Sequence, residues 1–244
     1  MKEEKYFTEE ETVWYHDGGF EETALFLHGY LSCKESFYYQ KKFFEQGFNV
    51  LIPDLPGFKE KTKLVTPYGL EDYAVWVENL LKRYNVKEVS VVAHSFGARV
   101  FFKLFARGNV KINRAVFVGA AGMKPRFSLI KKIKIARYKL RKKIGLDVSE
   151  FGSDDYKRLD ETTRASFVKI INERLEKDVK KVDVPALIIA GKKDEETPVY
   201  MQKKLHKLIK GSKLVKVNGD HFYFCKKPRE FNERAYAFLK GELR

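Results

Sequence analysis

The sequence has 244 residues and a formal net charge of +15, and 44% of its residues are hydrophobic. This length allows one large α/β domain with a substantial core, and the hydrophobic content excludes an intrinsically disordered chain. No apolar run approaches the roughly 18 residues of a membrane-spanning helix, and the charged N-terminus lacks the apolar core of a signal peptide. We therefore expect a soluble, cytoplasmic protein.

Six short apolar runs are predicted to form the strands of one sheet. Their continuous apolar centres are typical of a parallel sheet that is buried on both faces. In chain order they span residues 22–29, 48–54, 88–95, 113–122, 185–191 and 213–219. Residues 5–7 and 12–17 are candidates for an antiparallel hairpin at the edge of this sheet.

Segments with apolar residues at helical spacing lie between these strands and after the last one. They span residues 34–46, 70–84, 96–107, 199–210 and 228–243. Gly47, Gly108 and Gly211 follow three of these segments and are predicted C-terminal caps. The alternation of strands and helices predicts a mostly parallel, doubly wound sheet with helices on both faces.

One region interrupts this alternation. Residues 123–182 contain no convincing strand and are predicted to form helices joined by polar connectors. We therefore expect a core made of residues 1–122 and 183–244, with a helical cap inserted at residues 123–182.

Ser95 stands at the end of the predicted strand 88–95, and open parallel sheets place their ligand sites at such carboxyl ends. Ala93 and Gly97 lie two residues to either side. A sharp strand-to-helix turn needs small residues there because the backbone folds back on itself, and the turn exposes the serine hydroxyl. The same pattern also arises in purely structural turns, so its meaning depends on partner residues.

A serine nucleophile needs a base, and the base needs an orienting carboxylate. Of the five histidines, only His221 follows the last predicted strand, at the same sheet edge as Ser95. Asp194 follows the strand 185–191, and its spacing favours it over the neighbouring Glu195 and Glu196. These residues predict a Ser95–His221–Asp194 catalytic triad.

The first predicted strand, 22–29, ends in His28 and Gly29, where glycine permits a tight turn that points a backbone N–H into the site. We predict that the N–H groups of Tyr30 and Phe96 form an oxyanion hole. Predicted substrate contacts are His94, Gly29 and Phe222, and His94 also has an alternative role in shaping the turn around Ser95.

These motifs together resemble the α/β-hydrolase superfamily over nearly the whole chain. They are LHGY (27–30), PDLPGF (53–58), AHSFGA (93–98), GKKDEETP (191–198) and GDHF (219–222). The resemblance implies an α/β-hydrolase fold, the order Ser95, Asp194, His221 for the triad, hydrolysis through an acyl-enzyme, no cofactor or metal, and a helical cap. Ala93 replaces the commoner glycine, and a serine at this turn differs from the aspartate of dehalogenase members.

The predicted function is a serine hydrolase, most specifically a carboxylesterase that acts on small-molecule esters with small or medium acyl groups. Carbon–carbon bond hydrolysis of a dienoate-type ketone uses the same triad and stays open, as does a non-catalytic binding protein on the same fold.

Charge and cysteine content predict little beyond this function. Residues 124–143 contain ten basic residues and no acidic one, a pattern that fits a solvated cap helix, attraction of anionic substrates, or weak association with an anionic membrane surface. No nucleic-acid partner is expected, because charge without a binding motif is a weak signal. Cys33 and Cys225 are too few for a disulfide framework and are predicted to be reduced thiols.

Overall fold

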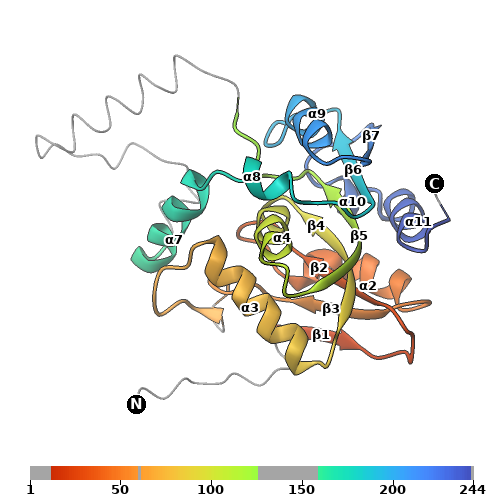
Figure 1. The fold of residues 1–244 in the computed structure, drawn as a ribbon, viewed down its shortest axis with the longest axis horizontal. Coiled ribbons are helices and arrows are strands. Elements are labelled where there is room, and N and C mark those ends of the chain that lie inside the picture. Colours follow the sequence, from red (N-terminus) through yellow and green to blue (C-terminus); the bar gives the residue numbers. More distant parts are fainter. Residues whose placement is uncertain (1–11, 60–61, 126–158, 243–244) are drawn as a thin grey trace, which may run out of the picture.

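The structure, a computed structural model, describes residues 12–59, 62–125 and 159–242, and these contain a seven-stranded sheet in the order β1-β3-β2-β4-β5-β6-β7 (Figure 1). The strands are β1 (Val13–His16), β2 (Thr23–Leu27), β3 (Asn49–Pro53), β4 (Glu88–His94), β5 (Lys111–Val118), β6 (Ala186–Gly191) and β7 (Lys213–Val217). β1 runs antiparallel to β3, and every other neighbouring pair is parallel.

All six predicted strands are confirmed, and β1 is the predicted antiparallel strand at the sheet edge. Residues 5–7, the other half of the predicted hairpin, lie outside the described residues. β5 ends at Val118, earlier than predicted, because Gly119 adopts a left-handed φ of 54° that turns the chain out of the strand.

Helices cover both faces of the sheet (Figure 1). They are η1 (Lys34–Phe37), α2 (Tyr38–Phe44), α3 (Leu70–Arg83), α4 (Phe96–Arg107), α7 (Glu161–Asn172), α8 (Glu176–Val179), α9 (Val199–Leu208), α10 (Tyr223–Lys226) and α11 (Pro228–Leu239). One hydrophobic cluster joins α3, α4, α8 and α9 to the sheet, and the other joins α2, α10 and α11 to it.

Strand β2 illustrates why the apolar runs of the sequence are continuous. All five of its residues are buried. Leu25 and Leu27 belong to the first cluster, whereas Ala24 and Phe26 belong to the second, because successive side chains of a strand point to opposite faces. The prediction of a sheet buried on both faces is therefore confirmed.

The predicted glycine caps have different outcomes. Gly108 ends α4 with a left-handed φ of 73°, as predicted. The prediction for Gly47 is wrong, because α2 ends at Phe44 and Gly47 is not left-handed. A Cβ atom on Gly47 would lie 2.0 Å from the hydroxyl oxygen of Tyr236, so a glycine here instead permits the close approach of α11.

The C-terminal part of the predicted cap, which contains α7 and α8, is attached to α4. Arg99 donates a hydrogen bond to the carbonyl oxygen of Glu173 at 2.9 Å, and Lys103 pairs with Glu173 and Asp178 at 2.7 and 3.0 Å. Residues 126–158, which carry most of the basic stretch, lie outside the described residues, so the alternatives for that stretch stay predictions. The division into core and cap therefore stays a prediction.

No helix among the described residues is both long enough and apolar enough to cross a membrane.

Candidate active site

Ser95 occupies a sharp turn between β4 and α4, with φ of 49° and ψ of −109°. A positive φ is unfavourable for a residue that has a Cβ atom, and such strain persists only where the surroundings impose it. The Ser95 N–H donates a hydrogen bond to Val118 O at 3.2 Å. A Cβ atom on Gly97 would lie 2.1 Å from Leu27 O, so only glycine lets α4 begin this close to β2.

Asp194 and His221 form a buried hydrogen-bonded pair at the same end of the sheet. Oδ2 of Asp194 lies 2.9 Å from Nδ1 of His221, and the two side chains are 1% and 6% exposed. Thr197 donates from its backbone N–H to Oδ1 at 2.8 Å and from its hydroxyl to Oδ2 at 2.9 Å. Burial by itself raises the pKa of Asp194, but hydrogen bonds from His221 and Thr197 outweigh burial and lower that pKa below its usual value. Asp194 is therefore an ionised acceptor for the Nδ1–H of His221.

Gly119, at the end of β5, leaves the space that this pair occupies. A Cβ atom on Gly119 would lie 3.0 Å from Nδ1 of His221 and 3.1 Å from Oδ2 of Asp194. Sequence reasoning missed both Gly119 and Thr197. A threonine three residues after an aspartate is a local signal for such a side-chain-capped turn, but nothing local marks the close approach at Gly119.

Nε2 of His221 is the nitrogen that remains for a reaction with Ser95. In this structure it lies 3.2 Å from Oε2 of Glu196, and the described residues show no hydrogen bond between Ser95 and His221. Ser95 and His221 nevertheless lie at the same end of the sheet, where the ring centroid of His94, the neighbour of Ser95, is 4.7 Å from that of His221. Bonds between catalytic residues are often formed only when substrate is bound.

The loop after β2 lies beside the serine turn. A Cβ atom on Gly29 would lie 3.6 Å from Cβ of Ser95. The Ser32 N–H donates to Gly29 O at 3.2 Å and closes a tight turn through Tyr30. Phe96 is the first residue of α4, and its N–H therefore has no carbonyl partner within the helix. The two predicted oxyanion donors thus come from segments that meet at Ser95.

Aromatic rings form one wall near this loop. The ring of Tyr30 lies 4.8 Å from Phe58, 5.7 Å from Phe96 and 5.0 Å from Phe167 of α7. Helix α7, which lies in the predicted cap region, therefore contributes a side chain to the surroundings of the site.

The three predicted substrate contacts have different positions. His94 is only 2% exposed, and its Nε2 donates a hydrogen bond to His221 O at 3.0 Å. This buried bond holds the backbone of His221. Gly29 is buried against the His94 ring. Phe222 is 45% exposed, and its ring centroid lies 5.4 Å from that of His221, so its role as a substrate contact stays a prediction.

A cluster of charged side chains joins the segment after β2 to the end of β3. Cys33, Glu35 and Asp54 have potential metal-ligand atoms within 4.8 Å of one another. Their carboxylates are already neutralised, because Lys34 lies 2.9 Å from Asp54 and Lys59 lies 2.6 Å from Glu35. A metal ion would have to displace both ammonium groups, and we therefore interpret the cluster as an ion-pair network that anchors the loop.

Both cysteines are free thiols, as predicted. Burial raises the pKa of Cys225 to about 11, and burial together with a hydrogen bond to Glu35 raises the pKa of Cys33. Both thiols therefore stay protonated at neutral pH, and neither has the character of a nucleophile.

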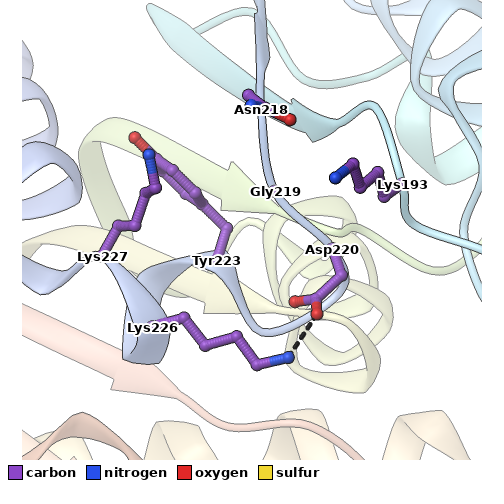
Figure 2. A pocket seen from close by; sticks show the side chains of 7 residues that line it. All are labelled: Lys193, Asn218, Gly219, Asp220, Tyr223, Lys226 and Lys227. Carbon is purple, nitrogen blue, oxygen red and sulfur yellow. Dashed lines mark hydrogen bonds and ion pairs between the residues drawn. The ribbon is translucent and has the colours of Figure 1, made fainter.

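A cavity of about 300 Å³ lies next to the segment that leads to His221 (Figure 2). It is lined by Lys193, Asn218, Gly219, Asp220, Tyr223, Lys226 and Lys227. Figure 2 shows Lys226 extended toward Asp220, with which it forms an ion pair. Neither Ser95 nor His221 lines this cavity, which is therefore separate from the candidate catalytic residues.

Two buried imidazoles predict a loss of stability in acid. Burial lowers the pKa of His28 to about 4 and that of His94 to about 3. Between these values and the ordinary value of about 6.5, the unfolded chain binds protons that the folded chain does not. The free energy of unfolding should therefore fall as pH drops below about 6.5, by about 1.4 kcal/mol per pH unit for each imidazole.

Urea unfolding between pH 7 and pH 4.5 measures this slope. His28→Asn and His94→Asn should each reduce it by roughly one proton's contribution, whatever their effect on stability at pH 7. A slope that is unchanged in both variants would show that these imidazoles are not the source.

A model of the α/β hydrolase fold family matches residues 24–168, and the chain belongs to this family. Its similarity to individual proteins is distant. The chain is 20% identical to the (E)-2-((N-methylformamido)methylene)succinate hydrolase of Acinetobacter baylyi, over 94% of each chain.

Solved structures share the fold over similar lengths. The structure is similar to an esterase from Exiguobacterium antarcticum, with 20% identity, a TM-score of 0.73 and coverage of 93% of this chain and 95% of the other. It is also similar to a meta-cleavage product hydrolase from Pseudomonas fluorescens, with 16% identity, a TM-score of 0.71 and coverage of 95% of each chain. The chain therefore belongs to a family of hydrolases, and the predicted resemblance to the α/β hydrolases is confirmed.

Proposed function

We propose that this hydrolase is a serine hydrolase, most specifically a carboxylesterase, that cleaves esters of small or medium acyl groups through an acyl-enzyme. The observation that carries the proposal is the 2.9 Å contact between Asp194 and His221, buried next to the strained turn of Ser95. Similarity to an esterase of known structure supports it.

In the proposed reaction, Oγ of Ser95 attacks the ester carbonyl carbon while Nε2 of His221 accepts the hydroxyl proton. Asp194 holds His221 in the tautomer with a proton on Nδ1 and stabilises the imidazolium that forms. The N–H groups of Tyr30 and Phe96 bind the carbonyl oxygen as it becomes negative. His221 then protonates the leaving alcohol, and water, activated by the same nitrogen, releases the acid and restores Ser95.

A second candidate reaction is hydrolysis of a carbon–carbon bond in a dienoate-type ketone. The similarity of this chain to a meta-cleavage product hydrolase of known structure supports this reaction as the alternative. The two reactions need the same triad but different pockets, so substrates separate them.

Labelling with a fluorophosphonate probe is the first experiment, because an activated serine reacts with it and a binding protein that only keeps the fold does not. A panel of p-nitrophenyl esters of increasing chain length, assayed beside a dienoate ketone, is the second. We expect labelling that is lost in Ser95→Ala and turnover of esters in preference to the ketone. Labelling of the variant would contradict the assignment of Ser95, and ketone turnover alone would replace the esterase proposal.

A further inference from the structure

The side chain of Glu196 contacts Nε2 of His221, the nitrogen that accepts the Ser95 proton in the proposed reaction. The proposed triad places only Ser95 at this nitrogen. Its Oε2 is 3.2 Å from Nε2, whereas Asp194 contacts the opposite ring nitrogen. The Glu196 N–H donates to Oδ1 of Asp194 at 3.0 Å, which fixes its backbone on the same turn as the acid. The carboxylate itself is 62% exposed and therefore accessible to a bound molecule.

The location of Nε2 defines the part of a substrate that Glu196 would meet. In the proposed reaction Nε2 delivers a proton to the oxygen of the leaving alcohol. A carboxylate in contact with Nε2 therefore lies on the leaving-group side of the site, away from the acyl group. A negative charge at that point attracts a cationic leaving group and repels an anionic one.

Two further charged residues, Glu195 and Lys193, lie on the same turn as Glu196. Glu195 is exposed and adds to the negative charge of the turn. Lys193, on the same turn, lines the lysine-rich cavity of Figure 2, but Glu196 does not line that cavity. Among the described residues, Glu196 is the charged residue in contact with Nε2 of His221, and its charge therefore lies on the leaving-group side of the site.

We infer that Glu196 is a specificity-determining residue that selects esters with a cationic or neutral leaving alcohol over esters whose leaving alcohol carries a carboxylate or phosphate. This inference rests on the proposed esterase function. It concerns the choice among substrates and assigns no proton transfer to Glu196.

Three esters with one acyl group test the inference: butyrylcholine, its uncharged isostere 3,3-dimethylbutyl butyrate, and the butyrate ester of a hydroxy acid of similar length. Acid release in a pH-stat gives kcat/KM for each. Unit charges a few ångströms apart in a partly hydrated site change a rate by about three- to tenfold. We expect kcat/KM to decrease by about this factor from the cationic to the neutral ester, and again to the anionic one.

Variants at two neighbouring positions separate a local contact from general surface charge. Glu196→Gln should bring the cationic-to-anionic ratio to within about threefold of one, and Glu196→Lys should reverse it. Glu195→Gln removes the same charge one residue away and should keep most of the ratio. Raising the salt concentration should reduce the ratio in the parent protein but have little effect on it in Glu196→Gln.

A ratio that persists in Glu196→Gln, or a parent enzyme that prefers the anionic ester, would overturn the inference while leaving ester hydrolysis in place. Failure of the parent to hydrolyse any of the three esters would overturn the proposed function, and the inference with it.

Discussion

Replacing Ser95 with alanine should lower kcat/KM for ester hydrolysis by about 10³-fold or more, because the residual rate comes only from the oxyanion donors and substrate binding. The fold should be retained. No hydrogen bond of the Ser95 hydroxyl is present among the described residues, and alanine keeps the Cβ atom that the turn already accommodates. Burst kinetics with a p-nitrophenyl ester measures the acyl-enzyme step directly, and urea unfolding checks the fold.

Ser90→Ala is the matched control for this variant. Ser90 lies in the same strand, β4, and its hydroxyl bonds to Glu22 outside the site. The control should keep its burst and most of its activity. A burst of product in Ser95→Ala would show that another residue is the nucleophile.

The second large effect is expected for Asp194→Asn, which should lower kcat by about 10³- to 10⁴-fold. Both oxygens of Asp194 accept hydrogen bonds, and Oδ1 accepts them from the backbone N–H groups of Glu196 and Thr197, which cannot reverse their polarity. The amide oxygen of asparagine must therefore take the Oδ1 position. Its NH₂ group then faces Nδ1 of His221 and imposes the tautomer with a proton on Nε2, which cannot accept the proton of Ser95.

Glu195→Gln makes the same chemical change on the same turn at an exposed side chain, and it should stay within a few-fold of the parent. Comparing kcat for the two variants on a neutral ester tests the assignment of the acid. Greater damage from the change at Glu195 than from that at Asp194 would mean that the acid is misassigned.

The framework of the site could be predicted because it follows from regular structure. Apolar runs of strand length identify β2, β4, β5 and β6, and parallel strands bring their carboxyl ends to one edge. Small residues around Ser95 identify the turn between β4 and α4. Asp194 and His221 follow from their places after β6 and β7, and the structure brings these two side chains together.

Other features could not be predicted because they depend on how distant segments approach one another. Gly47 looks like a helix cap in the sequence, but its role depends on Tyr236, which is contributed by α11. Gly119 likewise matters because two later loops fold over it. Glu196 follows Asp194 by two residues, and only the turn held by Thr197 directs it to the far nitrogen of His221.

The order of strands in the sheet also bears on when the site is completed during synthesis. β1 to β5 come from the first half of the chain and are neighbours, whereas β6 adds to β5 and β7 adds to β6 at one edge. The ribosome therefore releases the serine turn well before the acid and the base, which arrive with the last two strands. Proteins open locally as well as globally. Opening of this edge would separate the base from the nucleophile, so activity would be lost while the strands from β1 to β5 are still paired.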